Sequence, residues 1–357
     1  MASAANIPLI DISASGEEAQ LKVAKELVDA AVEHGFVYIR NTGADIPADA
    51  VERAFGLGKK IFDAPLEEKE KCIIQENNRG WGGMKYETLD PKNQKVGDLK
   101  EAFNFGTFEN GKAQQPIPES VAPYESQYSD FYELCYNLSL KINYLLGIGL
   151  EVQPPTFFRD RHLREGGPSG NILRFLYYPP PQSLGQDDAA EDVRAGAHSD
   201  YGSITLLFRL KGQAGLEVNL PDGSWAPVPV SPPGTEDDPS PPILVNIGDL
   251  LSYWTNGLLR STVHRVVFPG GDGRGLLSGE SDSEPRYSIA FFCHPVGTTT
   301  LETVPSSRVR AHEPTDGAEW AARGANPDVE RKAITADEHL QMRLRASYLQ
   351  MYDKEKQ

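Results

Sequence analysis

The spacing of hydrophobic positions along the chain changes near residue 170. Before that point the longest patterned stretch, Tyr124 to Gly147, is mostly free of glycine and proline and has apolar residues at helical spacing. It predicts the main supporting helix of the protein. The glycine-rich stretch 79–84 is predicted to be a turn rather than a lip over a pocket. Other predicted elements are a helix from a capping box at Ser15 and Glu18 to His34, helices in the fifties and from Pro65 to Glu70, and strands at 7–12 and 36–39.

From Asn171 onward the chain consists of short β-rich runs separated by proline and glycine. Many short strands with such turns indicate a sandwich or a barrel. Two polar segments, 231–242 and 270–285, are predicted surface loops. A capping box at Thr335 and Glu338 begins a C-terminal helix. One face of that helix would carry Leu340, Leu344, Tyr348 and Met351. The strands predicted before it are 171–178, 193–198, 203–209, 215–219, 243–247, 262–268 and 286–293.

Composition narrows the possible functions. The 357 residues suffice for one large or two small domains with a buried core. A net charge of -16 argues against a nucleic-acid or anionic-membrane partner. Cys72, Cys135 and Cys293 have no paired spacing, so neither a disulfide framework nor a cysteine zinc site is expected. With no secretory leader pattern and no apolar run of about 18 residues, the sequence predicts a cytoplasmic enzyme acting on a small molecule.

The chemistry of the chain centres on His198 and Asp200, which stand two residues apart at the head of an apolar run. Residues i and i+2 of a strand share a face, so imidazole and carboxylate point the same way. His264, in a later β-rich run, is the natural second histidine. Two histidines and one carboxylate that leave positions open are typical of non-haem Fe(II) oxygenases. Zinc accepts the same ligands, so a zinc hydrolase or a non-catalytic binding protein stays open.

A second constellation lies on the strand at 286–293. The period of two places Arg286, Ser288, Ala290 and Phe292 on one face. A buried guanidinium is costly without an anion, and its planar fork suits a carboxylate. Arg286 with Ser288 is therefore predicted to clamp a carboxylate, the alternative being a structural arginine paired with an acidic side chain.

The pocket wall is predicted from residues near these two constellations. On the strand at 171–178, Arg174, Leu176 and Tyr178 share a face, and Tyr178 is expected to donate to the bound acid. Asp249 is the rival carboxylate, but it is predicted to lie in a turn before a strand. The candidates for contact with the substrate, which suit a planar or acidic molecule, are Asn171, Arg174, Tyr201, Phe292, Trp81 and Phe103.

The remaining histidines are predicted to lie outside the metal site. They are His34, His162, His294, His312 and His339, of which the last two are expected in exposed segments.

Across residues 7–352 the chain resembles the Fe(II)/2-oxoglutarate-dependent dioxygenases of the isopenicillin-N-synthase-like group, and in particular fungal members. The resemblance implies an α+β, mainly β fold, a double-stranded β-helix (jelly roll) flanked by N-terminal and C-terminal helices. It implies an N-terminal region at 1–165, the jelly-roll core at 166–300 and a C-terminal extension at 301–357. The motifs that carry it are Ile7-Pro8-Leu9-Ile10-Asp11, Gly35-Phe36-Val37-Tyr38, His198-Ser199-Asp200, Gly248-Asp249-Leu250-Leu251, Trp254-Thr255-Asn256-Gly257, Ser261-Thr262-Val263-His264-Arg265-Val266 and Arg286-Tyr287-Ser288 with Phe291-Phe292.

The resemblance also implies site roles and a reaction. His198, Asp200 and His264 would bind Fe(II), and Arg286 with Ser288 would hold the distal carboxylate of 2-oxoglutarate. With O2 as oxidant and ascorbate helpful in vitro, the products would be succinate, CO2 and an oxidised substrate. Hydroxylation is the default outcome; desaturation, cyclisation and ring expansion are alternatives. A fungal natural-product intermediate is the expected substrate, with a pyrimidine base or an amino acid as alternatives, and a monomer or weak homodimer is the expected state.

Three departures from the family pattern qualify these expectations. Many relatives have an asparagine where this chain has Leu176, so one contact to the co-substrate is missing or replaced. An iron oxidase that does not use 2-oxoglutarate, of the isopenicillin N synthase or aminocyclopropane-carboxylate oxidase type, therefore stays open. The chain has Asn41-Thr42-Gly43 where the family usually has Asn-His-Gly. The segment between His264 and Arg286 is longer than in plant relatives.

Overall fold

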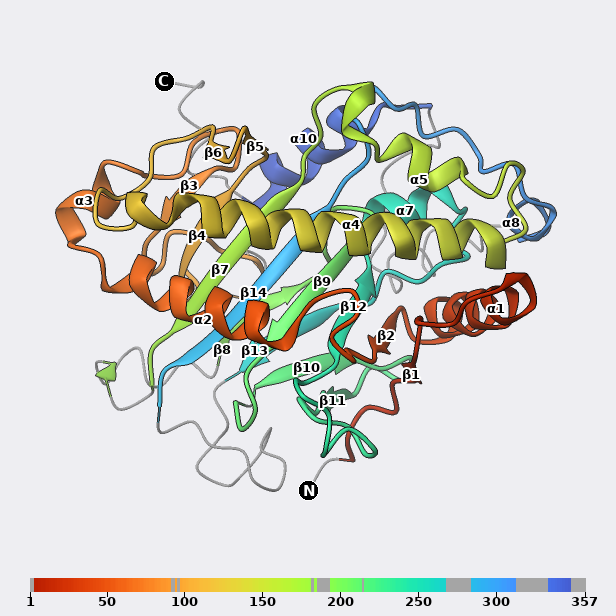
Figure 1. The fold of residues 1–357 in the computed structure, drawn as a ribbon, viewed down its shortest axis with the longest axis horizontal. Coiled ribbons are helices and arrows are strands. Elements are labelled where there is room, and N and C mark those ends of the chain that lie inside the picture. Colours follow the sequence, from red (N-terminus) through yellow and green to blue (C-terminus); the bar gives the residue numbers. More distant parts are fainter. Residues whose placement is uncertain are drawn as a thin grey trace.

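The computed structural model describes residues 3–90, 94, 97–180, 183–184, 193–213, 215–267, 284–312 and 333–347. Two sheets face each other in the middle of the molecule (Figure 1). The larger has the order β1-β2-β12-β9-β14-β7-β4-β3, formed by Leu9–Ile10, Phe36–Ile39, Ile243–Ile247, Ile204–Arg209, Arg286–Cys293, Ile172–Tyr178, Glu101–Phe105 and Gly80–Gly82. The smaller has the order β11-β10-β13-β8, formed by Trp225–Pro227, Leu216–Asn219, His264–Val267 and Val193–His198, and β5 (Phe108–Glu109) pairs with β6 (Lys112–Ala113) in a separate hairpin.

Helices cover the outer face of the larger sheet. The longest, α4 (Glu125–Gly149), crosses in front of β7, β14 and β9, with α2 (Ala48–Asp63) beside it (Figure 1). α1 (Glu17–Glu33) packs against α4. The remaining helices are α3 (Leu66–Glu70), α5 (Phe157–Arg161), α7 (Asp249–Trp254), α8 (Ser307–Ala311) and α10 (Ala336–Ser347), with 3-10 turns η1 (Ala122–Tyr124) and η2 (Arg164–Gly166).

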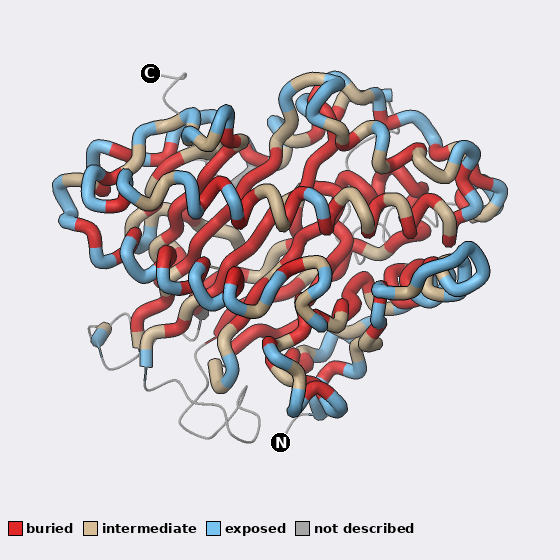
Figure 2. The backbone as a smooth tube through the Cα atoms, viewed as in Figure 1, coloured by how far each residue is buried: buried red, intermediate tan, exposed pale blue. Residues whose placement is uncertain are grey.

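The larger sheet is buried on both faces, as the tube through its strands shows in Figure 2. Along β7, Leu173 and Phe175 belong to the core under the helices, whereas Leu176 belongs to a second core between the two sheets. Along β14, Phe291 belongs to the core under the helices and Ala290 to the core between the sheets. Alternate side chains of β7 and β14 therefore point into the space between the sheets, as the period of two predicts.

Most of the predicted elements are confirmed, and the differences have local causes. The predicted main helix is α4, and Thr335 with Glu338 forms a reciprocal capping box: the Glu338 backbone N–H donates to Thr335 Oγ1 at 3.2 Å and the Thr335 N–H to Glu338 Oε2 at 2.7 Å. The capping box at Ser15 is wrong, because α1 begins after Gly16 with no side-chain cap. Most of 270–285, with Tyr348 and Met351, lies outside the described residues.

The sequence pattern did not predict β3 and β4, which extend the larger sheet beyond β7. The glycine-rich stretch predicted as a turn contributes β3, whose Trp81 pairs with Phe103 of β4. Their addition brings the segments before each strand to the mouth of the space between the sheets. Cys72, Cys135 and Cys293 are free and buried. In the described part of the chain no helix combines the length and apolar character needed to cross a membrane.

Candidate active site

His198, Asp200 and His264 meet at one end of the smaller sheet. His198 is the last residue of β8 and His264 the first of β13, and the two are directly paired in the antiparallel register. Their ring centroids lie 4.4 Å apart, and each Nε2 lies 3.8 Å from Asp200 Oδ1. Each residue offers one ligand atom, and these atoms all lie within 4.8 Å of one another. Among the described residues this is the one group of three or more His, Cys, Asp or Glu side chains that could hold a metal ion.

Backbone carbonyls orient both imidazoles. His198 Nδ1 lies 2.7 Å from the Gly196 carbonyl and His264 Nδ1 lies 3.1 Å from the Thr262 carbonyl. A carbonyl oxygen only accepts, so in each ring Nδ1 carries the proton and Nε2 keeps its lone pair. Both lone pairs belong to the nitrogens that approach Asp200, which is the arrangement that metal-binding histidines use.

The Asp200 carboxylate is held through one oxygen. Oδ2 accepts hydrogen bonds from Thr205 Oγ1 at 2.6 Å and Asn246 Nδ2 at 2.7 Å, while Oδ1 faces the histidines. Burial alone would raise the pKa of Asp200, but the imidazoles and the donated hydrogen bonds outweigh it and hold that pKa below its usual value. Burial, with His264 beside it, lowers the pKa of His198 to about 4. An ionised carboxylate and a neutral imidazole are the forms that bind a metal, so the donor set fits a divalent cation.

Asp249 lies beside this group without joining it. It is the first residue of α7, so the predicted turn before a strand is wrong. Its carboxylate accepts from Ser199 Oγ at 3.0 Å and Ser261 Oγ at 2.7 Å, and pairs with Arg343 at 2.8 Å. Burial raises the pKa of Asp249. The carboxylate ties together the two segments that carry the ligands, which is a structural role.

The remaining histidines stay out of the cluster. His162 is buried, with Nε2 2.8 Å from Ser203 Oγ. His339, predicted in an exposed segment, is only 6% exposed because the apolar face of α10 turns it toward Tyr253. His294 lines a cavity next to the cluster. Burial lowers the pKa of all three, so each is neutral near pH 7.

One cavity, with about 550 Å³ of empty space, lies between the two sheets and is here called the Arg286 cavity. Arg286 is 3% exposed; its guanidinium carbon lies 4.7 Å from the centre of the Tyr178 ring, and Nη1 lies 3.5 Å from Ser288 Oγ. The residues that line it are Leu89, Lys100, Arg174, Leu176, Tyr178, Ala195, His198, Asp200, Thr205, Leu207, Leu216, Asn246, His264, Val266, Arg286, Ser288, Ala290 and Phe292. The predicted carboxylate clamp thus faces the same space as the three candidate ligands.

Lys100 is a second cation in this cavity, and it was not among the residues predicted for the site. It is 4% exposed and pairs with Glu87 at 2.9 Å and, more closely, with Asp98. Burial would lower the pKa of Lys100, but the two carboxylates outweigh it and raise that pKa above its usual value. Lys100 therefore stays charged. The available signal was the alternation of Asp98 and Lys100 around a leucine, which places both on one face.

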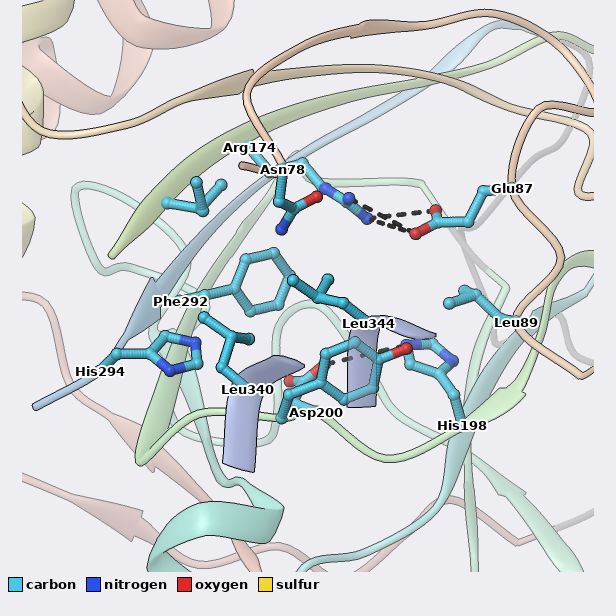
Figure 3. A pocket seen from close by; sticks show the side chains of 12 residues that line it. Asn78, Glu87, Leu89, Arg174, His198, Asp200, Phe292, His294, Leu340 and Leu344 are labelled. Carbon is cyan, nitrogen blue, oxygen red and sulfur yellow. Dashed lines mark hydrogen bonds and ion pairs between the residues drawn. The ribbon is translucent and has the colours of Figure 1, made fainter. Parts of the chain in front are cut away.

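A second cavity, with about 460 Å³ of empty space, adjoins the first and is here called the Glu87 cavity (Figure 3). Its polar side holds Glu87 and Arg174, with Arg174 Nη1 3.2 Å from Glu87 Oε2 and Arg174 Nε donating to Asn104 Oδ1 at 2.7 Å. Apolar side chains, among them Phe292, face this pair across the cavity. The full lining is Asn78, Glu87, Leu89, Ile172, Arg174, His198, Asp200, Tyr201, Phe292, His294, Leu340 and Leu344.

Three of the six predicted pocket residues, Arg174, Tyr201 and Phe292, line the Glu87 cavity; Asn171, Phe103 and Trp81 do not. Asn171 Oδ1 accepts from the backbone N–H of His294 at 2.6 Å, which joins the start of β7 to the end of β14. Phe103 points into the core under the helices, and Trp81 packs against that core while its Nε1 donates to Glu101. These three side chains are therefore not part of the wall of the Glu87 cavity.

Comparison with known proteins defines the class. Residues 169–295 match the family model of the 2OG-Fe(II) oxygenase superfamily, and residues 7–125 match the non-haem dioxygenase in morphine synthesis N-terminal family. The chain belongs to the 2OG-Fe(II) oxygenase superfamily. It is an Fe(II)- and 2-oxoglutarate-dependent dioxygenase with a jelly-roll fold, which uses O2. These findings do not favour the zinc hydrolase, the silent binding protein or the iron oxidase without 2-oxoglutarate.

Individual relatives are similar over most of their length. The chain is 38% identical over 302 residues to the UPF0676 protein C1494.01 of Schizosaccharomyces pombe, covering 83% of this chain and 84% of that one. It is 30% identical over 322 residues to the 2-oxoglutarate-dependent dioxygenase tropC of Talaromyces stipitatus, covering 84% and 89%. Among solved structures, a full-length Neurospora crassa protein in complex with alpha-KG and thymine is similar with a TM-score of 0.74 and 29% identity, covering 97% of this chain and 99% of that one.

Proposed function

We propose that His198, Asp200 and His264 bind the Fe(II) of this dioxygenase. The observation that carries the proposal is the convergence of three ligand atoms within 4.8 Å where the two cavities meet. Two imidazoles and one carboxylate suit Fe(II) and leave positions for other ligands. When bound, the iron activates O2 together with the keto acid; the side chains around it position the reactants and keep the carboxylate ionised.

The Arg286 cavity is the proposed 2-oxoglutarate site. The Arg286 fork can bind a carboxylate through two parallel hydrogen bonds, and the Ser288 hydroxyl can add a third. Tyr178 supports the guanidinium from its ring face. Leu176 also lines the cavity, so an apolar side chain stands where the family resemblance led us to expect an asparagine. The keto acid would make one fewer polar contact there, and the clamp would carry more of its affinity.

The Glu87 cavity is the proposed substrate site. Its polar side is close to neutral, because the charge of Arg174 is balanced by Glu87. A free carboxylate would have to compete with Glu87 for the guanidinium, so we infer a neutral polar group on the substrate rather than the acidic one that the sequence suggested. The opposite side, with Phe292, Leu340 and Leu344, suits an apolar or flat body.

A natural-product intermediate is the first candidate substrate. The similar proteins include 2-oxoglutarate-dependent dioxygenases of Talaromyces stipitatus, Glarea lozoyensis and Penicillium crustosum, which supports oxidation of a fungal secondary metabolite. A pyrimidine base is the second candidate, because the similar Neurospora crassa structure is a complex with thymine and thymine offers a flat ring with neutral polar edges. Each turnover would convert 2-oxoglutarate and O2 to succinate and CO2 and insert the second oxygen atom into a substrate C–H bond.

Succinate release tests the proposal. Purified protein is supplied with Fe(II), ascorbate and 2-oxoglutarate, and succinate is measured alone, with thymine and with a panel of neutral natural-product scaffolds. We expect slow release without substrate and a rise of at least about tenfold with a true substrate. Omitting Fe(II) or adding Zn(II) instead should stop release. A wild-type protein that neither binds 2-oxoglutarate nor releases succinate with any compound would refute the proposed site.

A further inference from the structure

α10 forms one wall of the Glu87 cavity. Leu340 and Leu344 of this helix line the cavity opposite the Arg174–Glu87 pair (Figure 3). The first turn is tied to the segment after β14, because the Asp337 backbone N–H donates to the Gly297 carbonyl at 3.0 Å and the Ala336 N–H to the Thr299 carbonyl at 2.9 Å. Backbone hydrogen bonds therefore hold the start of the helix.

Arg343 makes a second attachment, one turn from the end of the described helix. Its Nη2 lies 2.8 Å from Asp249 Oδ2 and 3.5 Å from Ser199 Oγ. Its guanidinium carbon lies 5.0 Å from the centre of the Tyr201 ring. Ser199 stands between His198 and Asp200, and Tyr201 follows them. Arg343 thus contacts Asp249 at the start of α7 and, through Ser199 and Tyr201, the segment that carries two candidate metal ligands.

Asp249 extends this attachment to the third ligand. The carboxylate that binds Arg343 also accepts from Ser261, three residues before His264, and the Asp249 backbone N–H donates to the Asp200 carbonyl at 2.7 Å. The side chain of Asp249 is 3% exposed. One buried carboxylate therefore joins both ligand-bearing segments, and Arg343 supplies its ion-pair partner.

We propose that Arg343 is a positioning residue that couples α10, the wall of the substrate cavity, to the loop bearing His198 and Asp200. The proposal rests on the proposed iron site. α10 would then have two roles. Its leucines line the substrate cavity, and its arginine fixes the position of the metal ligands relative to that wall. Filling the metal site then steadies the helix, and docking the helix strengthens metal binding, because coupling between two sites acts in both directions.

The chemistry of the Arg343–Asp249 pair explains why its loss should weaken metal binding. Removing one partner of a buried ion pair leaves the other charge without compensation, so Asp249 would keep only the hydrogen bonds from Ser199 and Ser261. Both polar contacts of Arg343 are made by the same nitrogen, Nη2, so a lysine ammonium that reached this position could replace them in part. Loss of a partner that orients metal ligands typically weakens metal affinity about 10- to 100-fold.

Mn(II) binding to the full chain tests the proposal. We expect Arg343→Gln to weaken Mn(II) affinity by about tenfold or more, and Arg343→Lys to recover part of the loss. Arg345→Gln, an exposed arginine on the same helix, is the matched control and should leave the affinity within about twofold of the wild type. Asp249→Asn combined with Arg343→Gln should cost less than the sum of the single changes, because no charge is then left buried alone.

Hydrogen exchange supplies the readout that a merely structural contact would not move. Mn(II) should slow amide exchange in 336–345 of the wild-type protein, and this protection should be lost in Arg343→Gln and partly restored in Arg343→Lys. Unchanged Mn(II) affinity and unchanged protection in both variants, even with a lower melting temperature, would overturn the coupling. If Arg343→Gln does not fold, the lysine variant decides alone. Failure of the wild type to bind Mn(II) would instead refute the iron site.

Discussion

Replacing Arg286 with methionine should remove most of the affinity for 2-oxoglutarate. Methionine keeps an apolar stem over the Tyr178 ring while it removes the charge and the fork. In the wild type the guanidinium is 3% exposed, so a bound carboxylate meets it away from bulk water. Truncating one partner of a buried, hydrogen-bonded charge pair costs about 2–5 kcal/mol. A loss of about 3–4 kcal/mol corresponds to a dissociation constant raised about 10²- to 10³-fold.

Calorimetric titration of 2-oxoglutarate into the Mn(II)-loaded protein measures this change without turnover. Pyruvate provides an internal comparison, because it has the keto-acid head and lacks the distal carboxylate. Arg286→Met should therefore leave pyruvate binding within about twofold while it removes 2-oxoglutarate binding. Arg286→Lys should fall between the two, since it keeps the charge and loses the bidentate geometry.

Arg265 offers a matched control in the same barrel. It follows His264 but stacks on Trp225 at 4.1 Å and pairs with Glu217 at 2.8 Å, away from the Arg286 cavity. Arg265→Ala should retain 2-oxoglutarate affinity. If Arg286→Met binds 2-oxoglutarate as the wild type does, or loses pyruvate to the same extent, the clamp lies elsewhere and the assignment of this cavity is wrong.

Three further outcomes are expected. His264→Ala should abolish Mn(II) binding in equilibrium dialysis, and an unchanged metal content would remove this residue from the ligand set. Thr205→Val deletes one of two hydrogen bonds to Asp200 Oδ2 and should weaken Mn(II) binding about tenfold; equal affinity would mean that Asn246 holds the carboxylate alone. Burial lowers the pKa of His162 to about 4 in the folded protein, against about 6.5 in the unfolded chain. Between these two values only the unfolded chain binds the proton, so each unit by which the pH is lowered decreases the free energy of unfolding by about 1.4 kcal/mol. Denaturant melts from pH 7 to 5 should show a smaller slope in His162→Gln.

The barrel core could be predicted from the sequence because its signals are local. The period of two along β14 sets Arg286 and Ser288 on one face, and the structure places that face between the sheets. The spacing of His198 and Asp200 predicted their shared direction from a strand, but β8 ends at His198, and hydrogen bonds from Thr205 and Asn246 orient Asp200 in the loop that follows. Even the start of α10 could be predicted, since the Thr335–Glu338 box depends on residues three apart.

The substrate wall could not be predicted because it depends on contacts distant in sequence. Glu87 lies in an irregular segment that reaches the cavity only once β3 and β4 have joined the sheet beside β7. Neither of those strands has a clear alternating pattern. Leu344 was expected on the apolar face of a helix, but no periodicity says which surface that face covers. Phe103 shows the opposite error, because a large aromatic near the site belongs to the core behind the sheet.

The two cavities differ in the origin of their walls, and this difference bears on how substrates are chosen. The polar groups of the Arg286 cavity come mainly from strands of the two sheets, whose register fixes them. The Glu87 cavity takes Asn78, Glu87 and Leu89 from the segments around β3, and Leu340 and Leu344 from α10. Changes in these outer segments leave the paired strands intact. The barrel can therefore keep one co-substrate while the flanking segments alter the substrate. Replacing Asn78, Leu340 and Leu344 while Arg343 is kept should change substrate preference with little effect on 2-oxoglutarate affinity.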